Sequence, residues 1–135
     1  MLLTARLLPE DKGHPVAWHD LSAQVGPLRI NGSQHPLFRE RAVLSRYLRR
    51  AGGERPAPAI DFPRRQLLLV SPGPRSSTGY GVDVLSVREH DGQITVRVRE
   101  RAPKLGEPVE ARVTYPYRLL SLPAGEDVYV DWVGR

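Results

Sequence analysis

The clearest pattern in this chain is an alternation of apolar and polar residues on both sides of the dipeptide Asp91-Gly92. Val82, Val84 and Val87 precede the dipeptide, and apolar residues follow it at positions 94, 96 and 98. Alternation is typical of a strand with one buried face, and Asp-Gly supplies the left-handed residues of a tight hairpin turn. The pattern therefore predicts a β-hairpin whose polar residues line a solvated face: Thr95, Arg97, Arg99 and Arg101.

Two further segments supply most of the expected core. Residues 67–70 form a continuous apolar run, which is typical of a strand buried on both faces. A second set of apolar residues returns at steps of three and four, which predicts a helix over about residues 37–51 that ends at Gly52-Gly53 and lies on a sheet. This set consists of Phe38, Ala42, Leu44, Tyr47, Leu48 and Ala51.

Weaker patterns predict the remaining elements, which are mostly strands. They are strands at 2–8 and 17–26 around a turn at 9–13, an extended connector at 53–63, and two or three strands within 109–123 and 126–134. The expected fold class is α+β and mainly β: a small antiparallel curled sheet, or a partly open barrel or sandwich, with one helix packed on it. We expect a single domain over residues 1–135, with N-terminal strands and the helix in 1–57 and a β region in 58–135.

The composition indicates short secondary-structure elements and excludes several kinds of chemical site. The 12 Gly and 13 Pro in 135 residues imply many turns, and the absence of Cys excludes a disulfide, a thiolate nucleophile and a thiolate metal site. No window approaches 18 consecutive apolar residues, so no transmembrane segment is expected. Residues 1–13 lack the regions of an intact signal peptide, so an exported protein would have had its signal removed.

The formal net charge of +5 allows two interpretations. Its densest part lies on the predicted helix, at Arg39, Arg41, Arg46, Arg49 and Arg50. Arginines at the C-terminal end of a helix stabilise it against the helix dipole, typically by ~0.3–1 kcal/mol each. The same residues could instead bind nucleic acid or an anionic surface, although nucleic acid is the less favoured partner because the basic excess is small and lies mainly in the N-terminal part of the chain.

No group of residues indicates catalysis. The four histidines are not spaced as a set of metal ligands, and the nucleophile-elbow, zinc-protease and phosphate-loop patterns are missing. Gly79-Tyr80-Gly81 begins a predicted strand, whereas a dinucleotide fingerprint needs a following helix. We therefore expect no enzyme activity, no cofactor and no metal.

The segment between the two core strands is the candidate binding site. Its glycines and hydroxyls fit a turn that satisfies its own backbone, which the residues alone favour, and they also fit a binding loop exposed at a sheet edge. Two tyrosines farther along the chain could line the same edge or pack in the core. The candidate partner-binding residues are Arg75, Ser76, Ser77, Thr78, Gly79, Tyr80, Tyr115 and Tyr117.

Several short motifs occur in an order that resembles a known family. They are Ile60-Asp61-Phe62, Leu68-Leu69-Val70, Gly73, Arg75, Thr78-Gly79-Tyr80, Val84, Asp91-Gly92, Val96, Val98, Glu100, Pro103, Gly106 and Thr114-Tyr115-Pro116-Tyr117. Over residues 58–123 the chain resembles the C-terminal domain of the PrcB family, named for a subunit of a surface protease complex. The family's usual T-G-G-Y stretch corresponds here to Ser77-Thr78-Gly79-Tyr80, with a small polar residue in place of a Gly.

The resemblance implies a non-catalytic bacterial accessory protein, exported or lipid-anchored, that associates with and stabilises or modulates a secreted subtilisin-like protease. In that role Thr78 and Gly79 would make polar contacts, Tyr80 would anchor the partner and Arg75 would lie at the rim. The loop also resembles the N-P-T-T-G-Y loop of chagasin-type protease inhibitors. An extracytoplasmic location follows from the resemblance, with a cytoplasmic one left open, and an exposed edge strand could pair two copies.

Overall fold

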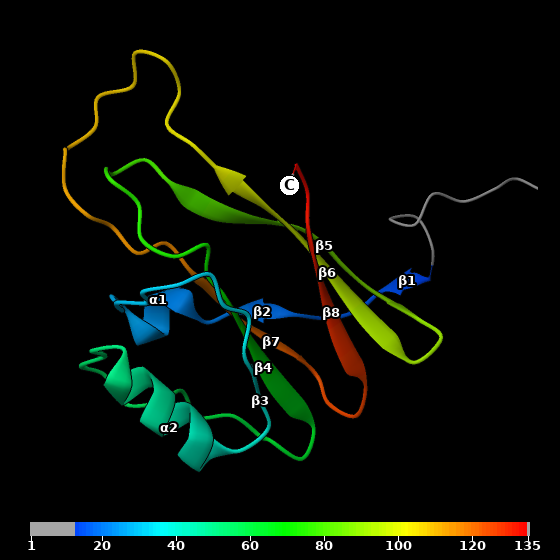
Figure 1. Cartoon of the computed structure of the whole chain (residues 1–135). Helices are drawn as coiled ribbons and strands as arrows, with labels where there is room; N and C mark the ends of the chain where they lie inside the picture. Colours follow the sequence, from blue (N-terminus) through cyan, green and yellow to red (C-terminus); the bar gives the residue numbers. More distant parts are fainter. Residues whose placement is uncertain (1–12, 135) are drawn as a thin grey trace, which may run out of the picture.

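Two four-stranded sheets and two short helices make up residues 13–134, which are the residues that this computed structural model describes (Figure 1). Sheet A has the order β1 (His14–Pro15), β5 (Gly81–His90), β6 (Gln93–Arg101) and β8 (Asp127–Trp132). Sheet B has the order β2 (His19–Asp20), β7 (Arg118–Pro123), β4 (Arg65–Val70) and β3 (Leu37–Phe38). The helices are α1 (Ser22–Val25) and α2 (Arg41–Arg50). The chain is therefore mainly β, as predicted.

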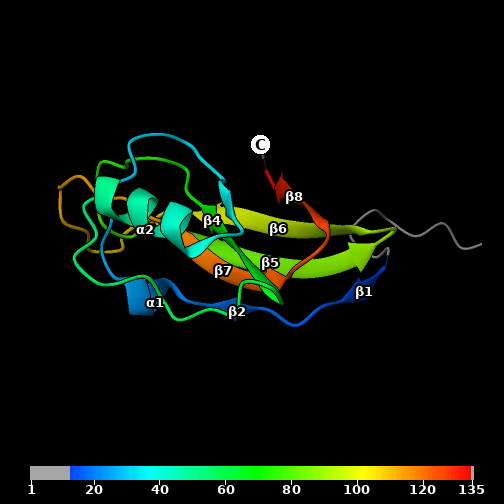
Figure 2. The ribbon, with the colours of Figure 1, turned by 90° about the horizontal axis from the view of Figure 1, so that it is seen from below.

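Sheet B is the middle layer of the molecule. Leu67 and Leu69 of β4 pack in a core under the helices, whereas Leu68 and Val70 pack in a second core between the sheets. Figure 2 shows both helices toward one side of the molecule and the β5–β6 turn at the other. Because alternate residues of a strand point to opposite faces, β4 supplies both cores, and the prediction of a strand buried on both faces is confirmed.

The predicted hairpin is confirmed as β5 and β6. Asp91 and Gly92 have φ values of 50° and 77°, the left-handed conformation that a tight hairpin turn requires. The register shifts between Val84 and Ser86, and Leu85 is the extra residue of this bulge. The bulge explains why the inward-facing residues Val84 and Val87 are three positions apart.

Of the expected alternatives the sandwich holds, because the sheets are neither closed nor curled. One feature of the expected sheet was wrong: β8 runs parallel to β6 instead of antiparallel. The reason is a change of sheet: after β6 the chain enters sheet B as β7, and residues 124–126 return it to sheet A. The buried Gln66 amide holds this return by donating to the Pro123 and Glu126 carbonyls at 2.9 and 3.1 Å.

Helix α2 begins four residues later than predicted, at Arg41. Leu37 and Phe38 instead pair with β4, and Glu40 is extended, with φ −139° and ψ 137°. Phe38 still covers the helix, because its ring meets that of Tyr47 edge to face at 5.2 Å. The helix ends as predicted, before glycines at positions 52 and 53.

Other expected strands are shorter than predicted or are replaced. In the 17–26 segment only His19–Asp20 pairs, because the Asp20 carboxylate accepts from the Ser22 backbone N–H at 2.9 Å and turns the chain into α1. Residues 109–117 contain a single bridge, at Thr114, and no strand. The expected strand at 2–8 lies outside the described residues.

Candidate functional site

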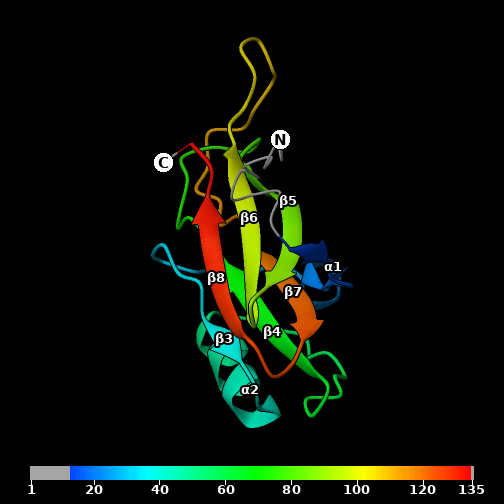
Figure 3. The ribbon, with the colours of Figure 1, turned by 90° about the vertical axis from the view of Figure 1, so that its right-hand side faces the viewer.

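Two loops, residues 71–80 and 102–117, lie side by side at one end of the molecule and are called here the paired loops (Figure 3). An isolated antiparallel bridge joins them. The Arg75 N–H donates to the Thr114 carbonyl at 2.8 Å, and the Thr114 N–H donates to the Arg75 carbonyl at 2.9 Å. Sequence reasoning proposed the first loop as a site, and the structure adds the second as its support.

The hydroxyl groups of the paired loops are used between the loops. The Thr78 N–H donates to the Glu110 carbonyl at 3.1 Å, and the Thr78 hydroxyl accepts from the Glu110 N–H at 2.9 Å. The Thr114 hydroxyl donates to the Ser77 carbonyl at 2.8 Å, and the Ser77 hydroxyl to the Thr78 carbonyl at 3.0 Å. Thr78 therefore braces the loop, whereas Ser76 is exposed.

Gly79 allows the two loops to approach closely. Its φ is +96°, and a Cβ at this position would lie 2.8 Å from Cγ of Pro103 and from Oε2 of Glu107. Contacts below 3.0 Å require a neighbour to move, and a positive φ of this size is costly for a residue with a side chain. The Thr-Gly-Tyr sequence thus fits the packing of these loops against each other.

Arg75 fixes the base of the first loop to sheet A. Its guanidinium donates from Nε and Nη2 to the two carboxylate oxygens of Glu100 at the end of β6, and the Nη2 bond is 2.8 Å long. The side chain is only 25% exposed, and the hydrogen bond to Glu100 raises the pKa of Arg75. Such a bidentate pair orients both groups, so Arg75 is a structural brace more than a cation at the rim.

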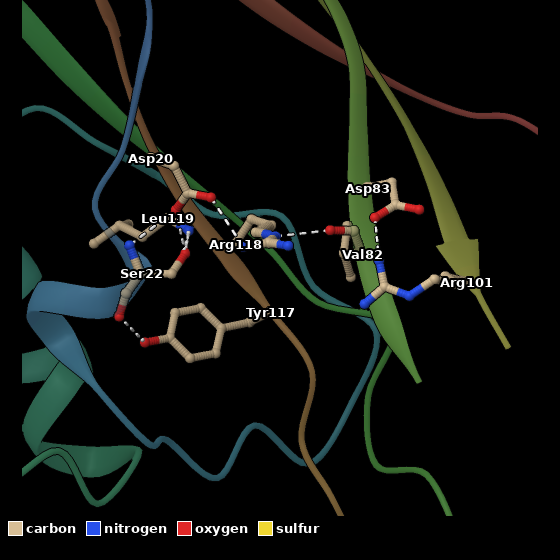
Figure 4. Close-up of polar contacts among 8 residues, drawn as sticks. All are labelled: Asp20, Ser22, Val82, Asp83, Arg101, Tyr117, Arg118 and Leu119. Atoms are coloured by element: carbon tan, nitrogen blue, oxygen red, sulfur yellow. Dashed lines mark hydrogen bonds and ion pairs between the residues drawn. The ribbon is translucent and has the colours of Figure 1, made fainter. Parts of the chain in front are cut away.

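The three tyrosines of the predicted site occupy different surroundings. The Tyr117 hydroxyl donates to the Gly26 carbonyl oxygen. It also lies 3.2 Å from the Ser22 carbonyl oxygen (Figure 4). These contacts tie the start of β7 to α1. Burial, and secondarily the charge of Asp20, raise the pKa of Tyr117 to about 12. Tyr80 and Tyr115 are half-buried. The structure therefore places Tyr117 in the packing under the helices, which leaves Tyr80 and Tyr115 beside the paired loops.

The residues around Tyr117 also tie the two sheets together. Arg118 donates to the Val82 carbonyl of β5 at 2.7 Å and to the Asp20 carboxylate at 3.0 Å (Figure 4). Arg101 at the end of β6 pairs with Asp83 of β5. These contacts fix the strand ends from which the paired loops leave.

The tip of the second loop exposes one large apolar side chain, Leu105, which sequence reasoning did not select. Its relative exposure is 106%, and that of Val113, farther along the loop, is 57%. The Glu107 N–H donates to the Lys104 carbonyl at 3.0 Å and Gly106 has φ +82°, so Leu105 lies in a hydrogen-bonded turn between Lys104 and Glu107. The sequence does contain one signal for this residue: Leu105 is an apolar residue in a Pro- and Gly-rich segment that has no strand-like alternation.

The arginines of α2 form a separate surface. All four of them are exposed, as is Arg39 just before the helix, and Arg41 donates to the Pro58 and Ala57 carbonyls at 3.0 and 3.2 Å. A cleft of about 330 Å³ beside the helix is lined in part by Arg41, Arg49 and Arg55. Glu54 also lines this cleft, so its charge is mixed.

Residues 13–134 show neither a cluster of metal ligands nor a membrane-spanning helix. Within them no three His, Asp or Glu side chains gather into a group that could hold a metal ion. No helix among these residues is long and apolar enough to cross a membrane.

Comparison with known proteins bears on one part of the chain. No curated protein and no solved structure matches it. The family model described as PrcB C-terminal matches residues 67–123, a range that runs from β4 to the end of β7 and includes both of the paired loops. The predicted resemblance is thus confirmed, and residues 67–123 of this chain are a PrcB C-terminal domain.

Proposed function

We propose that this protein is a non-catalytic, extracytoplasmic accessory protein that binds a secreted protease through the paired loops and stabilises or modulates it. The observation that carries the proposal is an apolar tip on a braced support: Leu105 is fully exposed, while Arg75, Thr78 and Thr114 fix the loops behind it. Membership of residues 67–123 in the PrcB C-terminal family supports a protease as the partner.

A braced projection favours binding in two ways. Loops that are already ordered lose little conformational entropy when they bind, so more of the contact energy becomes affinity. Burying a leucine side chain in a partner's apolar pocket contributes roughly 1.5–3 kcal/mol. Leu105 therefore acts as the anchor, with Val109 and Val113 extending the apolar contact and Ser76 and Tyr80 at its side.

The test is capture of a protease by the immobilised protein from secreted and envelope fractions, followed by titration of the purified protease. We expect Leu105→Ser/Val113→Ser to weaken binding at least tenfold. Val43→Ser is the matched control, because Val43 is 39% exposed on α2 and lies outside the paired loops. Equal binding by the double variant and the wild type would contradict the proposal, and so would the absence of any protease among the captured proteins.

The same purified pair separates an accessory role from inhibition of the chagasin type. An accessory protein lengthens the half-life of the protease at elevated temperature and leaves its turnover in place. An inhibitor abolishes turnover at a 1:1 ratio. If turnover is lost with the wild type and retained with the Leu105→Ser/Val113→Ser variant, the paired loops are inhibitory.

A second candidate function is binding of nucleic acid or another anionic surface through α2. It is favoured by the exposure of Arg39 and of the four arginines of α2, and by the cleft that Arg41 and Arg49 line. If the protein contacted 6–10 phosphates, raising the salt concentration from 50 to 200 mM would lower its affinity about 10³–10⁵-fold. A fluorescent oligonucleotide titrated at both salt concentrations tests this, and binding that does not change with salt would exclude it.

A further inference from the structure

The edges of the two sheets are built unequally. Among the described residues, β1, β2 and β3 at three of the edges have two residues each, whereas β8 at the fourth has six. Very short edge strands are a common protection against unwanted pairing with other chains. The β8 edge lacks this protection, and its Asp127–Trp132 sequence also has no Pro, no Lys and no shift in register.

One side of β8 is occupied by β6 and the other has no strand partner among residues 13–134. The pairing with β6 is continuous from Gln93↔Asp127 to Val98↔Trp132. The Val133 N–H donates to the Val98 carbonyl at 2.8 Å, so by alternation Asp131 and Tyr129 bond toward β6. By the same alternation, Val128 and Val130 turn their backbone groups to the open side. Figure 3 shows β8 at the edge of its sheet, beside β6.

The side chains of β8 give this edge two different faces. Val128 and Val130 pack against the core between the sheets. Asp127, Tyr129 and Asp131 lie on the outer face, where Tyr129 is 55% exposed. Arg97 pairs with Asp131 at 3.2 Å, whereas Asp127 has no ion pair among the described residues. The outer face of the edge therefore carries the carboxylate of Asp127 beside the Arg97–Asp131 pair, and its inner face is apolar.

We propose that β8 binds an extended segment of another protein, which adds a fifth strand to sheet A. The segment carries Lys or Arg at alternate positions, beside Asp127 and Asp131, and apolar residues between them that continue the inter-sheet core. Backbone hydrogen bonds to Val128 and Val130 supply affinity, and the alternating side chains supply selectivity. This surface is separate from the paired loops, so the proposal does not depend on the proposed function.

A second copy of this chain meets a charge conflict in one register of this edge. Symmetric antiparallel pairing of two β8 strands about Tyr129 would place Asp127 of each copy opposite Asp131 of the other. Like charges directly opposite each other across a strand pair are destabilising, and here two such pairs would form. Pairing about Val128 or Val130 avoids this conflict, so self-association through β8 is the alternative that the experiment has to separate from a basic partner strand.

The test uses two capped eight-residue peptides, one alternating Lys with Val and the other alternating Glu with Val. Each is titrated into the full, isotope-labelled chain and followed through backbone amide NMR shifts. We expect the Lys peptide to shift the Val128 and Val130 amides and to bind at least tenfold more tightly than the Glu peptide. In Asp127→Lys this preference should disappear or reverse, and Glu54→Lys, with the same charge change on a distant exposed loop, should retain it.

Several results would overturn the proposal. They are equal binding of the two peptides, shifts confined to residues outside β8, the absence of binding at millimolar peptide, and dimerisation of the wild type through β8 in sedimentation and NMR. If Asp127→Lys does not fold, Asp127→Asn serves instead, because it removes the charge without reversing it and should narrow the preference for the Lys peptide severalfold. An unchanged preference in a folded Asp127→Asn would also count against the proposal.

Discussion

Replacing Tyr117 by Phe removes a single hydroxyl that holds α1 against β7. The hydroxyl donates to the Gly26 carbonyl and the ring is half-buried, so its loss leaves that carbonyl without this donor. A hydrogen bond of this kind contributes about 1 kcal/mol to the free energy of unfolding. At pH 8 we therefore expect Tyr117→Phe to be less stable than the wild type by about 1 kcal/mol, with the fold retained.

The same hydroxyl makes this difference depend on pH. Burial raises the pKa of Tyr117 from 10.0 to about 12 in the folded protein. Between these values the unfolded chain loses the proton and the folded chain keeps it, so stability falls as pH rises. The contribution is complete below pH 10 and is lost toward pH 12. At pH 11 the loss is about 1.4 kcal/mol for a fully buried group, and solvent screening of this half-exposed ring reduces it to roughly 0.5–1 kcal/mol.

Urea unfolding of both proteins at pH 8 and pH 11 measures the effect. The difference in unfolding free energy between wild type and Tyr117→Phe should shrink from about 1 kcal/mol at pH 8 to about 0–0.5 kcal/mol at pH 11. Other groups that titrate in this range, including Tyr47, are present in both proteins and cancel from the comparison. A difference that is the same at both pH values would refute the assignment of the raised pKa to this hydroxyl.

Three further substitutions test the packing and the paired loops. Gly79→Ala should destabilise the protein by about 1–3 kcal/mol, and by more than Gly106→Ala does. Both glycines have a positive φ, but only Gly79 has close neighbours. Equal decreases in melting temperature for the two variants would contradict the close approach at Gly79. Leu44→Ala should cost about 2–5 kcal/mol in urea unfolding since Leu44 is 0% exposed, whereas Val43→Ala on the outer face of α2 should change stability by less than about 0.5 kcal/mol. Arg75→Lys should lower the free energy of unfolding by about 1 kcal/mol, because an ammonium cannot make the bidentate contact with Glu100. A urea unfolding midpoint identical to that of the wild type would show that the contact is not stabilising.

Local sequence patterns predicted the elements whose partners are close in sequence. The β5–β6 hairpin depends on alternation and on Asp91-Gly92, and both act over a few residues. The start of α2 was harder, because Leu37 and Phe38 fit the helical period and also fit a strand. Pairing with β4 determined the outcome, and that contact is some thirty residues away along the chain.

The parallel β8 and the shape of the site needed the structure. Nothing near β8 indicates that the chain visits the other sheet between β6 and β8, because that route is a property of the whole fold. The first of the paired loops was selected from its residues, but the roles of those residues were not. Thr78 contacts the second loop, and Arg75 contacts β6. Leu105 was not predicted as a site residue, because a single apolar residue in a turn forms no local pattern.

The two cores of this protein share the strands β4 and β7. Leu67 and Leu119 belong to the core under the helices, and Leu68 and Leu120 belong to the core between the sheets. Neither core can open without exposing the strands that the other one needs. Amide hydrogens in β4 and β7 should therefore exchange with solvent only when the whole molecule unfolds, while those of the paired loops exchange through small local openings. Sheet B therefore keeps the strand ends that carry the paired loops in place, even while single loop amides open.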